Sequence, residues 1–160
     1  MKKNRIIMAL LLFVALIGLT ACGGGGTSTD KTPLTAADFK SKMEAKSDFK
    51  VVDDNQQFAG NDSIVQVYIA YNGKFQIEFY EQKTEADAKA SFDLNKSNFE
   101  AAKDSNAVTT IDEKGNWSKY TQVSGGKFGV VSKIGNTFIY VNVDEQYKDD
   151  VNSILQELGY

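Results

Sequence analysis

Alternating apolar and polar residues on both sides of an Asn-Gly pair form the clearest pattern in the chain. Segments 64–71 and 74–81 flank Asn72-Gly73, the pair that two-residue type I′ hairpin turns prefer. Apolar residues stand at every second position of both segments: Val65, Val67, Ile69 and Tyr71, then Phe75, Ile77 and Phe79. This period of two predicts an antiparallel hairpin with one buried face.

The other predicted strands are short apolar segments bounded by turn residues. They span 49–52, 107–111, 117–123, 127–133 and 137–143. The last four are separated by glycine-containing pairs that are typical of hairpins: Gly115-Asn116, Gly125-Gly126 and Gly135-Asn136.

Three helices are predicted between and after these strands. Thr35 and Thr84 each begin a helix, with an aspartate three residues later as in a capping box, and the second helix runs to about Lys103. Asp144 caps the last helix, which has apolar residues at helical spacing: Tyr147, Val151, Ile154, Leu155 and Leu158.

This order predicts one α+β domain, a meandering antiparallel sheet of about seven strands with three helices packed on one face. Asn72-Gly73 and Gly135-Asn136 each precede a strand with aromatic residues and then a helix. We therefore also expect a weak internal duplication.

The first residues have a different composition from the rest of the chain. Lys2, Lys3 and Arg5 precede a run of 14 residues, from Ile6 to Leu19, that carries no charge. A membrane-spanning helix needs about 20 apolar residues, so this run is too short to be one. A basic start, a short apolar middle and small residues at the exit predict a signal peptide at 1–21.

The exit of this segment is Leu19-Thr20-Ala21-Cys22. It resembles the lipobox of bacterial membrane lipoproteins, in which an aliphatic residue, a small or β-branched one, and Gly, Ala or Ser precede a cysteine. The resemblance covers only the first 22 residues. It implies that a diacylglyceryl group is added to the sulfur of Cys22 and that the chain is cut just before this residue.

The resemblance also implies a location. Two acyl chains hold a protein stably on a membrane, whereas one does not. We expect the mature chain on the outer face of the cell membrane. The lysine- and asparagine-rich composition favours a Gram-positive, single-membrane cell. Residues 22–33 then form a lipidated cysteine and a flexible Gly/Ser/Thr linker, and residues 34–160 form the single domain.

Composition excludes several classes of partner and chemistry. The leader takes Lys2, Lys3 and Arg5 of the 18 basic residues, which leaves 15 lysines against 21 acidic residues. No arginine remains for bidentate phosphate recognition, so nucleic acid is a poor partner. The chain has no histidine, and its single cysteine is the residue expected to be lipidated. The usual general base and thiol nucleophile are therefore missing.

The remaining candidates for chemistry are carboxylates. Asp53, Asn55 and Gln57 begin the alternation of a calcium loop, but Phe58 stands where that loop requires glycine. A solvated loop is the favoured interpretation. We therefore predict no catalytic residues, no metal and no cofactor.

Aromatic residues give the positive indication. Four of them are expected on strand faces away from the core, where they would form a binding surface: Tyr68, Tyr80, Trp117 and Tyr140. The favoured hypothesis is a non-enzymatic binding or accessory module for an envelope protein, a peptide or a small ligand. The alternatives are a carboxylate- or lysine-dependent envelope hydrolase and a protective or inhibitory lipoprotein.

Overall fold

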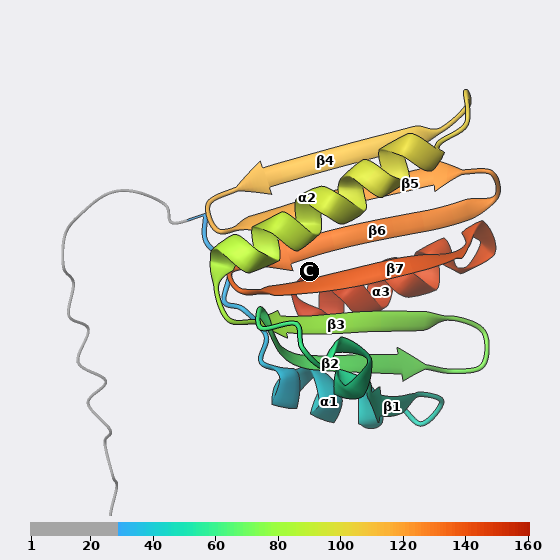
Figure 1. Cartoon of the computed structure of the whole chain (residues 1–160). Coiled ribbons are helices and arrows are strands. Elements are labelled where there is room, and N and C mark those ends of the chain that lie inside the picture. The colour runs from blue at the N-terminus through green and yellow to red at the C-terminus, as the bar shows by residue number, and fades with distance from the viewer. Residues whose placement is uncertain (1–28) are drawn as a thin grey trace, which may run out of the picture.

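The computed structural model describes residues 29–160, which build one seven-stranded antiparallel sheet (Figure 1). The strands are β1 (Lys50–Asp53), β2 (Ile64–Tyr71), β3 (Gln76–Gln82), β4 (Val108–Lys114), β5 (Trp117–Ser124), β6 (Lys127–Ile134) and β7 (Thr137–Asp144). Across the sheet they run β1-β2-β3-β7-β6-β5-β4, so β3 and β7 join two meanders at the centre. The predicted α+β class, with about seven strands and three helices, is confirmed.

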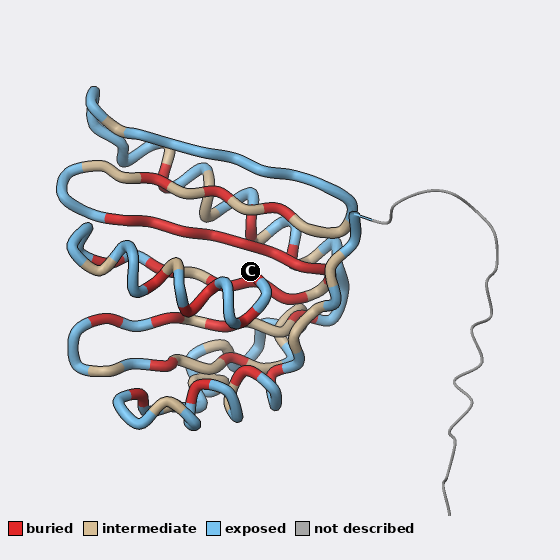
Figure 2. The backbone as a smooth tube through the Cα atoms, turned by 180° about the vertical axis from the view of Figure 1, so that it is seen from behind, coloured by how far each residue is buried: buried red, intermediate tan, exposed pale blue. Residues whose placement is uncertain are grey.

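The three helices lie on both faces of this sheet. α1 (Ala36–Glu44) and α3 (Lys148–Leu158) pack on one face, and α2 (Glu85–Ala102) crosses the other against β6, β7 and β3 (Figures 1 and 2). The prediction that all helices share one face is wrong. β6 is buried on both sides from Phe128 to Ile134, as is expected only of a strand that is covered twice.

Each face has its own core. On the α1/α3 face, Phe39 of α1 stacks on Phe79 of β3, with ring centroids 4.7 Å apart. On the α2 face, Phe92 and Phe99 pack against a smaller set of buried residues: Tyr120, Val131 and Phe138. The division explains why the central strands carry large apolar residues at both odd and even positions.

The β2–β3 hairpin differs from its prediction in the type of its turn and in the sheet face to which its side chains point. Asn72 has a negative φ, which a type I′ turn does not allow, and the loop is four residues long. Tyr68 lies opposite Phe79, so odd residues of one strand share a face with even residues of the other. The odd-numbered apolar positions of the two strands therefore point to opposite faces of the sheet.

The predicted internal duplication finds no support in this arrangement. β3 and β7 are antiparallel neighbours. The two-fold axis that relates two such strands is perpendicular to the sheet, so it does not exchange the two faces of the sheet. A duplication would place α2 and α3, which follow these strands, on the same face. They lie on opposite faces.

The start of the last helix also differs from the prediction. Asp144 does not cap α3: it precedes a 3₁₀ turn without a side-chain capping bond, and its carboxylate accepts a hydrogen bond from Lys127 at 2.6 Å. A 3₁₀ turn at Glu145–Tyr147 follows, and α3 begins at Lys148.

Candidate functional site

The four aromatic residues predicted to share a surface lie on two faces. Tyr68 and Trp117 border the α1/α3 core, whereas Tyr80 and Tyr140 border the α2 core. The expectation of one aromatic patch is therefore wrong. The register of β2 with β3 places Tyr68 and Tyr80 on opposite faces, and helix α2 covers the face that was expected to be open.

Tyr80 is part of a packed aromatic series. Its ring stacks on Phe138 with centroids 4.4 Å apart and an angle of 4°, and Phe58 meets it edge-on at 5.5 Å. The Tyr80 hydroxyl donates to Glu78 at 2.6 Å. Burial raises the pKa of Tyr80 well above its ordinary value, and the hydrogen bond to the Glu78 carboxylate adds to this. These contacts give Tyr80 a structural role.

Tyr140 and Trp117 are likewise engaged. Tyr140 stacks on Phe99 at 5.5 Å, and burial raises its pKa. The Trp117 indole donates to the backbone oxygen of Thr29 at 2.9 Å. Neither ring therefore has both faces open to a ligand.

A cleft lies where the two meanders of the sheet separate. The pairing of β3 with β7 ends at Glu78 and Tyr140, yet β3 starts at Gln76 and β7 continues to Asp144. A hollow of about 420 Å³ occupies this split. Its lining combines aromatic rings, side-chain amides and charged groups: Tyr71, Gly73, Lys74, Phe75, Gln76, Lys127, Asn142, Val143 and Asp144.

The cleft continues on the α2 face. A second hollow of about 280 Å³ lies under the C-terminal end of α2 and shares Lys127 and Asn142 with the first. Phe99 and Gln122 are among its lining residues. Because the two hollows share these lining residues near the end of β7, they are together called the β3–β7 cleft below.

Opposite charges are paired around the cleft. Lys127 donates to Asp144 at 2.6 Å, and both side chains are more than half exposed. Beside it, the Gln76 amide donates to Glu78 at 2.8 Å. Ions and amides together are suited to hold a polar ligand by hydrogen bonds, with Phe75 and Tyr71 providing apolar contact.

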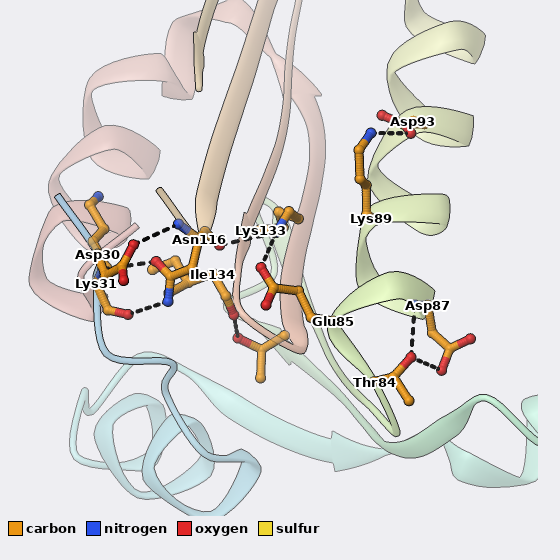
Figure 3. Close-up of polar contacts among 11 residues, drawn as sticks. Asp30, Lys31, Thr84, Glu85, Asp87, Lys89, Asp93, Asn116, Lys133 and Ile134 are labelled. Atoms are coloured by element: carbon orange, nitrogen blue, oxygen red, sulfur yellow. Dashed lines mark hydrogen bonds and ion pairs between the residues drawn. The ribbon is translucent and has the colours of Figure 1, made fainter. Parts of the chain in front are cut away.

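The described chain reaches the domain at the end of the sheet away from the β2–β3 loop (Figure 1), and Figure 3 shows the contacts made there. The Asn116 side chain accepts from the backbone N–H of Lys31 at 2.9 Å and donates to its carbonyl at 2.8 Å. Asp30 accepts from the Asn116 backbone N–H at 3.0 Å, and the Lys31 ammonium lies 4.3 Å from the centre of the Trp117 ring. Residues 29–31, called the strap below, are thereby fixed to the β4–β5 turn.

The strap corrects the predicted linker. Residues 29–33 pack on the domain, with Pro33 close to Gly135 of the β6–β7 turn, so this part of 22–33 is not a free spacer. The signal peptide and the lipobox, Leu19 to Cys22, lie outside the described residues. Their assignment remains a prediction.

The polar loop that begins at Asp53, for which a solvated loop was favoured over a calcium site, uses polar groups internally. Asp53 accepts from the backbone of Asn55 at 2.9 Å, and Asn55 accepts from the backbone of Val67 at 2.6 Å. Across residues 29–160, histidine, cysteine and acidic side chains form no group of three that could hold a metal. Within the same range, no helix is both long and apolar enough to cross a membrane.

The sequence did not reveal the β3–β7 cleft. The residues of its first hollow come from the β2–β3 loop, the start of β6 and the end of β7, and nothing in the local pattern indicates that β3 pairs with β7. The available signal was weak: Lys127, Asn142 and Asp144 are polar residues at the ends of otherwise apolar strands.

Comparisons with known proteins give no relative for this chain. No family model matches it, and neither a curated protein nor a solved structure is significantly similar.

Proposed function

We propose that this chain is a lipoprotein held on the outer face of the cell membrane by lipid on Cys22, and that its domain is a non-enzymatic binding module. The ligand is expected in the β3–β7 cleft. A polar molecule or a peptide that makes hydrogen bonds to Asn142 and Gln76 fits its lining best.

The observation that carries this proposal is the position of the strap relative to the cleft. Thr29 and Lys31 are fixed at the β4–β5 turn, whereas the cleft is lined by the β2–β3 loop and by the end of β7. Figure 1 shows that this loop and the β4–β5 turn lie at opposite ends of the sheet. An eight-residue strand such as β7 is about 26 Å long. The domain length thus separates the point of attachment from the proposed binding site.

The reach of the tether supports the same orientation. Seven residue steps join Cys22 to Thr29, and a fully extended chain spans at most about 3.6 Å per residue, or about 25 Å. A lipid on Cys22 would therefore keep the strap end of the domain near the bilayer. The cleft would face away from the membrane, where envelope partners are accessible.

The hydrolase alternative has less support. The carboxylates that line the cleft are engaged: Asp144 accepts from Lys127, and Asp104 accepts from the backbone of Asn106 and Gly125. Glu78 on β3 accepts from Tyr80 and Gln76. A paired-carboxylate hydrolase needs one protonated acid and one free carboxylate facing each other.

The tether is tested by mass spectrometry of the mature protein from a Gram-positive host. We expect an N-terminal residue 22 that carries a diacylglyceryl thioether, and release of a Cys22→Ser variant from the membrane fraction. An unmodified thiol, or a mature N-terminus elsewhere, would contradict the proposal.

The cleft is tested by photo-crosslinking on intact cells. A benzophenone amino acid at Gln76 places the probe in the cleft, and the same probe at Leu94, which is 62% exposed on α2, is the matched control. We expect a defined adduct from position 76 that is absent from position 94. Identical adducts from both positions, or none, would count against a binding role for the cleft. An adduct with a foreign enzyme would favour the inhibitory alternative.

A further inference from the structure

The two edges of the sheet differ in their protection. β1 has four residues, contacts α1 and is followed directly by a 3₁₀ turn at Asn55–Phe58. β4 has seven residues, and every one of them is exposed. Short or covered edges are how proteins prevent unwanted strand pairing. By this measure β1 is an edge protected against strand pairing, and β4 is an unprotected, open edge.

β4 carries only one of the features that commonly disrupt an added strand, a run of charged residues at its end. Its register with β5 is unbroken from Val108 to Lys114, so it contains no bulge, and its sequence has neither proline nor glycine. The charges lie in its second half, Asp112 to Lys114, whereas the first half is uncharged. Charged side chains on an edge oppose strand addition, so the uncharged segment Val108–Ile111 is the part of β4 most open to pairing.

Val108 and Ile111 are large apolar side chains on this edge that are not part of a core. Val108 is 65% exposed and Ile111 is 47% exposed, and they point to opposite faces of the sheet. Neither belongs to the α1/α3 core or to the α2 core. An added strand would cover apolar surface on both faces at once.

We propose that β4 is a docking edge at which an extended segment of a partner polypeptide adds an eighth, antiparallel strand. Recognition of this kind draws its affinity from backbone hydrogen bonds and its specificity from alternate side chains. The open backbone edge is what distinguishes β4 from the cleft as a second interaction surface.

The native neighbour β5 indicates the chemistry of such a segment. Side chains stand perpendicular to a sheet, so β4 presents the same groups to strands on either side. In β5, Tyr120 lies opposite Ile111, Lys119 opposite Asp112, and Val123 opposite Val108. We therefore expect an aromatic residue, a basic residue and a β-branched residue at the matching positions of the partner.

A second copy of this chain fits the β4 edge less well than a segment of another polypeptide. Pairing of two β4 strands in antiparallel fashion would place the two straps at opposite ends of the joined sheet, because each strap is fixed beside Asn116, just after β4. Copies tethered upright on one membrane have their β4 strands parallel. The preference for a foreign segment over a second copy rests on the proposed lipid tether. The proposal that β4 is an open edge does not depend on the tether.

The test uses a labelled peptide with the sequence of residues 117–124 and the secreted form of the chain, residues 22–160 with Cys22→Ser. Fluorescence anisotropy should show saturable binding, and amide NMR shifts should concentrate at 108–114. A peptide of the same composition in scrambled order should bind at least ten times more weakly.

Two lysine variants separate edge pairing from general effects. Ile111→Lys should weaken binding of the peptide at least tenfold. Leu94→Lys, an apolar-to-lysine change at a more exposed position on α2, should leave binding unchanged. Thr109→Lys serves as a second edge variant if Ile111→Lys unfolds. Absence of saturable binding, or equal binding by the edge variants, overturns the proposal.

Sedimentation of the same protein tests the second copy as occupant. A concentration-dependent dimer that is lost in Ile111→Lys would overturn the assignment of a foreign segment. A monomer at all concentrations supports it. Crosslinking from Gln76 in the cleft should not change in Ile111→Lys, so failure of the edge and failure of the cleft remain distinguishable.

Discussion

The side-chain amide of Asn116 and the backbone of Lys31 exchange two hydrogen bonds, at 2.9 and 2.8 Å, although 85 residues separate them. The two bonds have the same donor and acceptor pattern as a hydrogen-bonded residue pair in an antiparallel sheet. They attach the strap to the β4–β5 turn. This attachment therefore sets which end of the domain the preceding chain leaves from.

Asn116→Ala should release the strap. Loss of two partly exposed hydrogen bonds costs about 1 kcal/mol each at most, so the free energy of unfolding should fall only slightly. Trypsin should cleave after Lys31 several times faster, because the strap is no longer held. Urea denaturation and timed proteolysis measure both, with Asn98→Ala on exposed α2 as the control; equal cleavage of the two variants would contradict the role of Asn116.

Gly129→Ala should destabilise the α2 side of the domain. A Cβ at this position would lie 2.6 Å from Cε1 of the Phe99 ring, which is held between β6 and Tyr140. Overpacking of this kind costs about 1–3 kcal/mol, measurable by chemical denaturation. The double variant Gly129→Ala, Phe99→Leu should recover part of the loss, and strict additivity would show that the ring is not the cause.

Lys133 should tolerate an apolar replacement better than a truncation. Its side chain is only 6% exposed and its ammonium donates to Glu85 at 3.1 Å and to the Asn116 carbonyl at 3.0 Å (Figure 3). Lys133→Met keeps the volume of the buried stem, and buried ion pairs are often replaced at little cost, so a change within about 1 kcal/mol is expected. Lys133→Ala should cost about 2–3 kcal/mol through lost packing. Thermal unfolding of both variants decides whether the stem or the charge matters more.

Alkaline pH should destabilise the fold through its buried tyrosines. Burial raises the pKa of Tyr160 and Tyr120 well above the ordinary value, so the unfolded chain loses these protons first. Stability is therefore fully present below the ordinary tyrosine pKa of about 10 and falls as pH rises above it. In a pH titration followed by tyrosinate absorbance, some of the seven tyrosines of the native protein should ionise at higher pH than the others. In guanidinium all seven should ionise in a single transition.

Tyr160→Phe provides the control for that titration. The Tyr160 hydroxyl is hydrogen-bonded to Thr137, and the ring is 5% exposed. The variant should have a shallower loss of stability between pH 10 and 11 than the natural chain. An unchanged slope would mean that Tyr160 does not contribute to the alkaline transition.

Local patterns determined the elements of this protein. Capping threonines at positions 35 and 84 accept from the backbone of Asp38 and Asp87 as the sequence predicts, and glycine-containing pairs separate β4, β5, β6 and β7. These features depend on residues within a few positions of one another, so the sequence states them directly. The lipobox prediction is of the same local kind, although it lies outside the described residues.

Only the tertiary structure decided which face each element covers and where the cleft lies. Tyr68 and Tyr80 were expected on one surface, but antiparallel register and the position of α2 place them on opposite faces. The β3–β7 pairing that creates the cleft joins residues about 60 positions apart. Such pairing is selected by the burial of both faces at once, a property of the whole sheet that no short stretch of sequence carries.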